Sequence, residues 1–157
     1  MQHRRVHVDI ELQPDVADVR VLLCEYEASL PFALDFQNFD EELAALPGEY
    51  VPPRGELFLA RVDGQPAGCA GLRPLGERTA ELKRLFVRPH YRGASLGRQL
   101  TEAALATARE RGYARVRLDT TPGMEAAQAL YRSLGFREIE RYRLNPVHGA
   151  TFFELEL

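Results

Sequence analysis

The sequence contains no long apolar run and no export signal at its start. No window of its 157 residues approaches the roughly 20 consecutive apolar residues that a membrane-spanning helix needs. The opening residues, MQHRRV, lack the apolar stretch of a secretory signal. We therefore expect a cytoplasmic protein that has no membrane partner.

Cysteine and histidine are also scarce. Cys24 and Cys69 lie far apart and in no metal-binding spacing, so we expect two free, buried thiols in a reducing compartment. The four histidines are scattered, and no H-E-x-x-H segment is present. The sequence therefore predicts no metal site.

The chain has no excess of positive charge, since its formal net charge is -3 at pH 7. Nucleic-acid-binding domains usually carry a net basic face, so we expect no nucleic-acid partner. A hydrophobic content of 45% is ordinary for a globular protein, and no linker or repeat divides the chain. We predict a single domain over residues 1–157, which is long enough to bury one core.

Hydrophobic periodicity and turn residues predict a mixed α/β fold. The predicted strands cover residues 5–12, 56–61, 67–72, 79–87, 114–120, 136–144 and 151–157, and the predicted helices cover residues 15–29, 32–46, 96–111 and 125–134. A helical crossover joins the strands at residues 79–87 and 114–120, so these two should be parallel neighbours. The hairpins make the rest of the sheet antiparallel.

The segment from Leu82 to Thr101 holds five basic side chains and no aspartate or glutamate. Its middle, the turn RGASLG at residues 92–97, lies between a predicted strand and a predicted helix. A helix N-terminus presents unpaired backbone N–H groups and partial positive charge, and small residues let a ligand approach them closely. The turn also lies at the carboxyl end of one strand of the parallel pair, where ligands bind in open α/β sheets. The segment therefore predicts a site for a phosphate-bearing ligand.

The choice of ligand is narrowed by the motifs that the chain lacks and by two motifs that it contains. Neither G-x-x-x-x-G-K-[ST] nor a strand-linked G-x-G-x-x-G is present, which excludes the common nucleotide loops. The turn fits [Arg/Gln]-x-x-Gly-x-[Gly/Ala], with Ser95 at the position of the first glycine, and AQALYRSLGF at residues 127–136 fits A-x-x-x-Y-x-x-x-G-F. With these two motifs, the segment from Glu81 to Phe136 resembles the GNAT superfamily of acyl-CoA-dependent N-acyltransferases.

This resemblance implies a GNAT-like fold, with helices on both faces of a mostly antiparallel sheet, and acetyl-CoA as the co-substrate. It implies that the backbone of Leu85, Phe86 and Val87 holds the pantetheine arm. The residues expected to bind the pyrophosphate are Arg92, Gly93, Ala94, Ser95, Leu96, Gly97 and Arg98. A solvated surface role stays open for Arg88 and Arg98. Met124 replaces an asparagine that often contacts pantetheine in the family.

Transfer of an acyl group from a thioester to an amine needs a base, because an ammonium ion has no lone pair. Glu81 occupies the position of the base in family members that use a glutamate on this strand. An apolar neighbourhood (Leu82, Leu85 and Phe86) would raise its pKa toward neutrality, whereas a salt bridge with Lys83 would lower it. A surface glutamate without a catalytic role is the alternative.

The leaving thiolate needs a proton, and Tyr131 in the second motif is the candidate donor. A phenol with a pKa of about 10 and a thiol with a pKa of about 8.5 are close enough for easy transfer. The alternative is a packing tyrosine, since Ala127 and Leu134 lie at helical spacing from it.

The amine acceptor is much harder to identify from the sequence. The aromatic residues that could line its pocket are Tyr26, Phe32, Phe36, Phe39 and Tyr50, and the acidic residues that could attract a cation are Asp35, Asp40, Glu41 and Glu42. A buried aromatic face with a solvated acidic face is the alternative. Arg73 could bind a substrate carboxylate or pair with Glu77.

The sequence thus predicts an N-acetyltransferase that moves an acetyl group from acetyl-CoA to a primary amine directly, within a ternary complex. Neither Cys24 nor Cys69 lies in a nucleophile motif, so no covalent intermediate is required. The alternatives are a sensor that binds acyl-CoA without catalysis and a structural protein that binds another phosphate. The acceptor, a small molecule or a peptide, and a homodimeric state both stay open.

Overall fold

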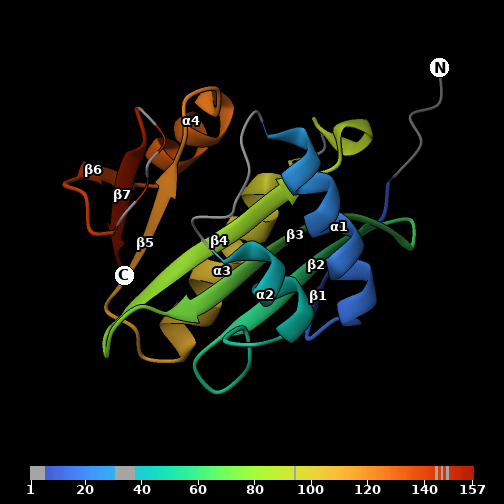
Figure 1. The fold of residues 1–157 in the computed structure, drawn as a ribbon, viewed down its shortest axis with the longest axis horizontal. Coiled ribbons are helices and arrows are strands. Elements are labelled where there is room, and N and C mark those ends of the chain that lie inside the picture. Colours follow the sequence, from blue (N-terminus) through green and yellow to red (C-terminus); the bar gives the residue numbers. More distant parts are fainter. Residues whose placement is uncertain (1–5, 31–37, 94, 144, 146, 148) are drawn as a thin grey trace.

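The computed structural model describes residues 6–30, 38–93, 95–143, 145, 147 and 149–157. Within them, seven strands form one sheet with α-helices on both faces (Figure 1). The strands are β1 (Val8–Leu12), β2 (Glu56–Val62), β3 (Gln65–Pro74), β4 (Thr79–Val87), β5 (Arg115–Thr120), β6 (Arg137–Ile139) and β7 (Thr151–Glu156). The helices are α1 (Val16–Ser29), α2 (Phe39–Ala45), α3 (Leu96–Glu110) and α4 (Glu125–Ser133), with a short 3₁₀ helix, η2 (Pro89–Tyr91).

The strands follow the order β1-β2-β3-β4-β5-β7-β6 across the sheet. Every neighbouring pair is antiparallel except β4 and β5, which are parallel and are connected through α3. The predicted mixed sheet with one parallel pair is therefore confirmed, and its cause is the helical crossover that the chain makes between these two strands.

The pairing of β4 with β5 is short. It runs from Thr79 opposite Arg115 to Glu81 opposite Arg117, and the two strands diverge beyond that point in the part of the chain that the structure describes. Further along β4, Arg84 has a φ of 61° and the register with β3 shifts between Cys69 and Gly71. Such a β-bulge bends the strand, and it lies just past the last β4–β5 pair.

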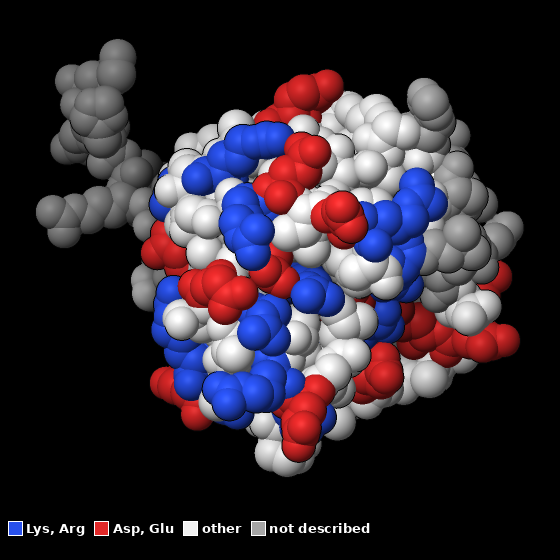
Figure 2. Space-filling model, turned by 90° about the vertical axis from the view of Figure 1, so that its left-hand side faces the viewer, with Lys and Arg blue, Asp and Glu red and all other residues white. Residues whose placement is uncertain are grey.

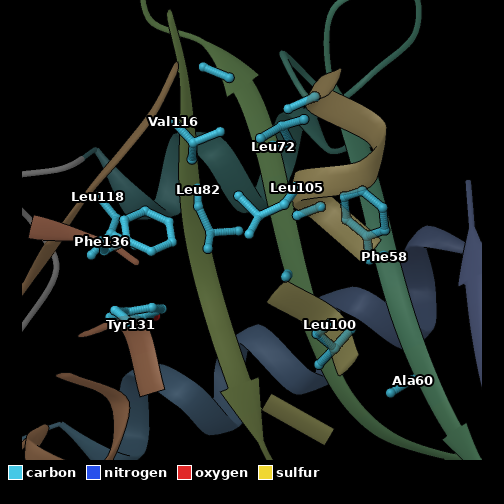
Figure 3. Close-up of a cluster of buried hydrophobic side chains, with 14 of the residues drawn as sticks. Phe58, Ala60, Leu72, Leu82, Leu100, Leu105, Val116, Leu118, Tyr131 and Phe136 are labelled. Carbon is cyan, nitrogen blue, oxygen red and sulfur yellow. The ribbon is translucent and has the colours of Figure 1, made fainter. Parts of the chain in front are cut away.

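Two apolar clusters pack on the two faces of the sheet. Helices α3 and α4 cover one face, where Leu82, Leu100 and Phe136 belong to one buried cluster (Figure 3). Helices α1 and α2 cover the other face, where Leu22 and Phe39 are buried. The four-residue spacing of Leu96, Leu100 and Ala104 accounts for the packing of α3, because residues four apart share one face of a helix.

Oppositely charged side chains form ion pairs at the β6 edge of the sheet. Glu154 on β7 accepts from Arg117 at 2.8 Å and from Arg137 at 2.9 Å, and Arg115 pairs with Glu156 at 3.3 Å. Figure 2 shows acidic and basic side chains interspersed on this side of the molecule. These pairs join three neighbouring strands and stabilise their register.

Two sequence predictions need correction, and a third is only partly tested. Strand β6 ends at Ile139 rather than at residue 144, because Tyr142 and Arg143 leave the strand to bond with Glu81 on β4. Cys24 is exposed, since it lies on the outer side of α1. Cys69 is buried as predicted, and burial raises the pKa of its thiol to about 12. The predicted helix over residues 32–46 is described only from Phe39, and residues 32–37 lie outside the described part of the chain.

Among the described residues, no helix combines the length and apolar character needed to cross a bilayer. The same residues contain no group of three or more histidine, cysteine, aspartate or glutamate side chains placed to hold a metal ion.

Candidate active site

The divergence of β4 and β5 leaves a cavity of about 80 Å³ between the two strands. Its walls come from β4, β5, α4, α1 and the segment between β6 and β7. The described lining residues are Tyr26, Leu82, Lys83, Arg84, Leu85, Leu118, Asp119, Thr120, Thr121, Met124, Ala127, Tyr131 and Asn145. A phenol, a carboxylate and an ammonium group therefore share one small space.

A larger groove of about 500 Å³ adjoins this cavity, with Leu85 and Ala127 in the walls of both. Its other described lining residues are Val87, Arg92, Gly93, Ser95, Leu96, Gly97, Arg98, Ala126 and Leu130. The structure thus brings the described residues of the predicted phosphate turn together with β4. Ala94 lies outside the described residues. A volume of this size is typical of a ligand site.

The backbone at the start of α3 has the geometry of an anion site. Gly93 and Ser95 adopt left-handed conformations, with φ values of 94° and 60°. The Ser95 side chain makes no capping hydrogen bond, and the first turn of α3 contains no acidic residue. The backbone N–H groups of this turn are therefore left to a ligand or to water, and the partial positive charge of the helix N-terminus favours an anion.

The arginines near the turn play different roles. Arg98 lines the groove, where it donates to the Ser133 hydroxyl at 2.7 Å and pairs with Glu102 at 3.5 Å. Arg88 forms a bidentate pair with Glu25 on α1, at 2.6 and 2.8 Å. Arg88 therefore joins β4 to α1, and it is not among the described residues of the groove wall.

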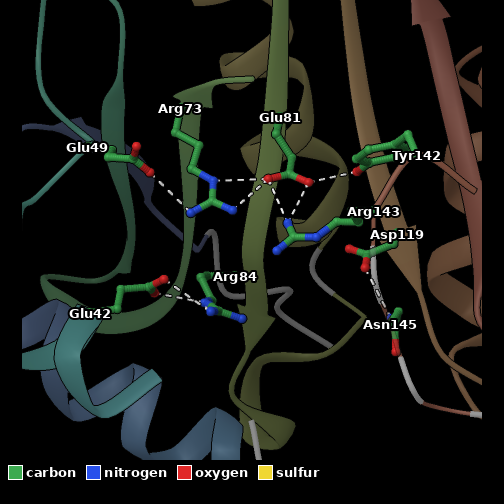
Figure 4. Close-up of polar contacts among 9 residues, drawn as sticks. All are labelled: Glu42, Glu49, Arg73, Glu81, Arg84, Asp119, Tyr142, Arg143 and Asn145. Atoms are coloured by element: carbon green, nitrogen blue, oxygen red, sulfur yellow. Dashed lines mark hydrogen bonds and ion pairs between the residues drawn. The ribbon is translucent and has the colours of Figure 1, made fainter. Parts of the chain in front are cut away.

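Glu81 is fully buried and bonded on several sides (Figure 4). Its carboxylate pairs with Arg73 at 2.9 Å and Arg143 at 2.8 Å, and it accepts a hydrogen bond from the Tyr142 hydroxyl at 2.7 Å. Burial acts to raise the pKa of Glu81, but the positive charges of Lys83, Arg73 and Arg143 outweigh it, so the pKa lies below its usual value.

The predicted rise in the pKa of Glu81 is therefore wrong. Cations surround this carboxylate, and they lower its pKa. The direction of the shift therefore agrees with the alternative, in which a neighbouring cation lowers the pKa. Glu81 is also not among the described residues that line the cavity.

Sequence reasoning did not identify the carboxylate that does line the cavity, Asp119. It lies near the carboxyl end of β5, and its Oδ2 accepts a hydrogen bond from the Asn145 side chain at 3.1 Å (Figure 4). The structure records no hydrogen bond from a described residue to its other oxygen, Oδ1. Its position follows a known rule, since ligands bind at the carboxyl ends of parallel strands.

Two cations on β4 complete the charged wall of the cavity. The side chain of Arg84 forms a bidentate pair with Glu42 on α2, at 2.8 and 3.1 Å. Lys83 is only 5% exposed, and burial lowers the pKa of its ammonium group to about 8, with Glu81 and Asp119 opposing that shift. The positive charge of Lys83 does lower the pKa of Glu81, but the ion pairs that the structure records for Glu81 are with Arg73 and Arg143 rather than with Lys83.

Tyr131 both lines the cavity and packs in the core. Its ring lies 5.5 Å from that of Phe136 and 6.3 Å from that of Phe153, measured between centroids. Burial raises the pKa of its phenol well above the usual value. The hydroxyl is therefore protonated throughout the physiological pH range.

The residues suggested for the acceptor pocket are not all brought together. Tyr26 lines the cavity, whereas Phe39 and Tyr50 are buried in the cluster beneath α1 and α2. Arg73 pairs with Glu81 and Glu49, so the alternative of a pair with Glu77 is wrong. Three of the suggested residues, Phe32, Asp35 and Phe36, lie outside the described part of the chain.

Comparison with known proteins assigns the chain to a family. The model of the acetyltransferase (GNAT) family matches residues 20–136. An uncharacterized N-acetyltransferase of Schizosaccharomyces pombe is 36% identical over 150 residues, which cover 94% of this chain and 92% of that protein.

Solved structures share the fold. A crystal structure of an acetyltransferase from Streptococcus agalactiae matches with a TM-score of 0.78 at 24% identity, covering 96% of this chain and 98% of that one. The PaiA N-acetyltransferase from Thermoplasma acidophilum, in complex with coenzyme A, matches with a TM-score of 0.72 at 17% identity, covering 95% and 99%. The chain belongs to the GNAT acetyltransferase family, and it is an acyltransferase.

Proposed function

We propose that this enzyme transfers an acetyl group from acetyl-CoA directly to a primary amine, within a ternary complex. The proposal rests on one observation, which is that the groove and the cavity adjoin. A groove with an uncapped helix N-terminus on its wall adjoins a buried cavity lined by Asp119, Lys83 and Tyr131. A phosphate-bearing arm and a reactive end group therefore have adjoining sites.

The described residues of the groove suit both the pyrophosphate and the pantetheine arm of coenzyme A. The backbone N–H groups at the start of α3 suit the pyrophosphate. Because β4 and β5 diverge beyond Glu81, the backbone of Leu85 and Val87 has no paired partner on β5 among the described residues. Unpaired strand edges bind extended amides, so this edge suits the pantetheine arm. The side chain of Phe86 points to the other face, into the cluster under α1.

We propose Asp119, rather than Glu81, as the group that accepts the proton of the amine. A base must lie within hydrogen-bond reach of the proton that it removes. Asp119 lines the cavity, whereas the carboxylate of Glu81 is occupied by Arg73, Arg143 and Tyr142. Those contacts favour a positioning role for Glu81, which would hold the segment after β6 against β4.

We propose Tyr131 as the proton donor to the departing thiolate, and Tyr131→Phe tests this role. The ring and its packing against Phe136 are kept, so stability should change little. We expect kcat to fall while the affinity for acetyl-CoA stays near wild type, because only the proton transfer is lost. Single-turnover rates should be compared, since slow product release can hide a chemical defect.

A packing role for Tyr131 gives the opposite pattern. Tyr131→Phe would then transfer acetyl groups at the wild-type single-turnover rate, and Tyr131→Ala would destabilise the fold by roughly 3 to 5 kcal/mol. An unchanged rate in Tyr131→Phe would mean that the thiolate leaves without help from this residue.

Gly97→Glu tests the phosphate turn. A carboxylate in the groove would repel the pyrophosphate, and like-charge contacts cost several kcal/mol, so we expect the affinity for acetyl-CoA to fall by about two orders of magnitude or more. A Cβ at this position would lie 3.6 Å from Leu130, which is an ordinary contact, so Gly97→Ala is the matched control for folding. Titration calorimetry measures both; unchanged affinity in folded Gly97→Glu would remove the turn from the site.

Release of free CoA thiol against a panel of amines tests the proposed function itself. We expect thiol release that depends on one class of amine and is matched by N-acetyl product. Tight binding of acetyl-CoA without thiol release on any amine would favour the sensor, and displacement of CoA by simple phosphate compounds would favour a structural protein.

A further inference from the structure

Asn145 places a buried amide in the wall of the candidate active site. The residue is 2% exposed, and it lines the cavity from the segment between β6 and β7. Burial of an amide costs free energy unless its polar atoms are hydrogen-bonded. The hydrogen bonds of Asn145 therefore indicate what holds it at this place.

Both ends of the amide are bonded. Its Nδ2 donates to Oδ2 of Asp119 at 3.1 Å (Figure 4), and its Oδ1 accepts from the backbone N–H of Val147 at 3.0 Å. A backbone N–H can only donate, so the atom that faces it is the amide oxygen, and the amino group is left to face Asp119. The turn from Asn145 to Val147 therefore fixes the orientation of the amide, with its donor toward the carboxylate.

Contacts with β4 hold the segment that carries Asn145. The Tyr142 hydroxyl and the Arg143 guanidinium bond to Glu81 at 2.7 and 2.8 Å, and Arg141 donates to the backbone oxygen of Asn145 at 3.2 Å. All of these contacts are made by the chain itself. Asn145 therefore reaches Asp119 without help from a substrate, which is the arrangement that a precise site needs.

The hydrogen bond from Asn145 distinguishes the two oxygens of Asp119. Oδ2 is held by the amide, whereas the structure records no hydrogen bond from a described residue to Oδ1. A general base works only when it lies within hydrogen-bond reach of the proton that it removes, so the rotation of its carboxylate matters. A fixed Oδ2 leaves Oδ1 as the oxygen that can meet an amine in the cavity.

We propose that Asn145 is a positioning residue for Asp119, which it holds through Oδ2 so that Oδ1 accepts the proton of the amine. The inference rests on the proposed role of Asp119 as the base. The proton that the amine loses passes to Oδ1, and the hydrogen bond from Asn145 to Oδ2 is kept. Because the amide is neutral, it stabilises the carboxylate without adding a charge to the cavity.

Other charged and titratable groups surround Asp119, and they are Lys83 and Arg84 on β4, Tyr26 on α1, Tyr131 on α4 and Tyr142 in the segment after β6. Burial raises the pKa values of the three phenols, so they stay uncharged at acidic pH. Arg84 stays charged and is paired with Glu42. Burial lowers the pKa of Lys83 to about 8, so an experiment must distinguish its titration from that of Asp119.

Direct observation of the hydrogen bond is possible because the chain contains only two asparagines, Asn38 and Asn145. In protein labelled with ¹⁵N-asparagine, the Asn38→Ser variant assigns the two side-chain NH₂ signals. In the wild-type complex with CoA, we expect the Asn145 signal to shift as the pH falls, with the same midpoint as the acidic limb of kcat/KM, calculated for the uncharged amine. Asp119→Asn should abolish this shift, whereas a shift caused by Lys83 would persist.

Asn145→Asp provides the second readout, since it replaces the amide with a carboxylate of the same shape. Two carboxylates at hydrogen-bond distance share a proton, so the acidic limb of kcat/KM should move to higher pH by about one unit or more. Gln65→Glu makes the same chemical change at the exposed start of β3, outside the described walls of the cavity and the groove, and should leave the limb in place. A purely structural role for Asn145 would lower the rate or the stability without moving the limb.

The outcomes separate this inference from the proposed function. An Asn145 signal that does not respond to pH, a response that persists in Asp119→Asn, or an unmoved limb in folded Asn145→Asp would overturn the inference and leave acetyl transfer intact. A near-wild-type rate in Asp119→Asn would overturn the proposed base, and this inference with it. The NMR titration uses wild-type Asn145, so a folding defect in Asn145→Asp would not obscure the result.

Discussion

Glu81→Gln is expected to lower the free energy of unfolding by about 3 to 5 kcal/mol, the usual effect of removing one partner from a buried ion pair. The carboxylate is fully buried, and its loss would leave Arg73, Arg143 and Lys83 without their shared anion. Urea denaturation at neutral pH measures the change. Glu49→Gln is the matched control, because Glu49 pairs with the same Arg73 but its side chain is 63% exposed, and it should change stability by no more than about 1 kcal/mol.

The pH dependence of stability gives an independent check on Glu81. The pKa of its carboxyl group is lower in the folded protein than its usual value of 4.5. The unfolded chain therefore binds the proton first as the pH falls, so the stability that Glu81 contributes is complete above about pH 4.5 and is lost through the folded-state pKa. The Glu81→Gln variant should lose less stability than wild type over this acidic range. Equal losses in the two proteins would contradict the assignment of a depressed pKa.

The same variant addresses the sequence-based hypothesis that Glu81 is the catalytic base. If that hypothesis holds, folded Glu81→Gln should show a kcat lower by about 10² to 10⁴-fold, a flattened acidic limb in its pH profile and little change in acetyl-CoA affinity. A positioning role predicts a smaller effect on kcat, together with a loss of stability.

Asp119→Asn is expected to lower kcat by about 10² to 10⁴-fold, the usual contribution of a general base. An asparagine side chain has the shape of the aspartate and can still accept the hydrogen bond from Asn145, so the fold should persist. Affinity for acetyl-CoA should stay near wild type, since the predicted phosphate turn lies at the start of α3 and Asp119 lies on β5. Asp9→Asn, which removes an exposed carboxylate from β1, is the control and should leave kcat unchanged. Activity of Asp119→Asn within a factor of about two of wild type would exclude Asp119 as the base.

The sequence predicted the architecture because its signals were local. The four-residue spacing of Leu96, Leu100 and Ala104 predicted α3, and the crossover that contains this helix predicted the parallel pair. The small residues of the turn predicted a backbone able to approach an anion, and the left-handed conformations of Gly93 and Ser95 agree with that requirement.

The details of the site could not be predicted because they depend on contacts between distant residues. Arg143 reaches Glu81 from 62 positions along the chain, so no local pattern indicated that the pKa of Glu81 would be lowered. β4 diverges from β5 just before the bulge at Arg84, and no sequence propensity indicates a positive φ for this non-glycine residue. Asp119 could have been identified, since it precedes the end of a strand predicted to be parallel to β4.

Direct acetyl transfer is tested by a single turnover of enzyme loaded with acetyl-CoA that carries a ¹³C-labelled acetyl group. After mixing with an excess of the amine identified by thiol release, the products are measured by mass spectrometry. We expect one labelled N-acetyl product for each CoA released and no label on the protein, whose candidate acceptors include its single lysine, Lys83, and its two cysteines. Saturated binding of acetyl-CoA with no labelled product from any amine would contradict the proposed function.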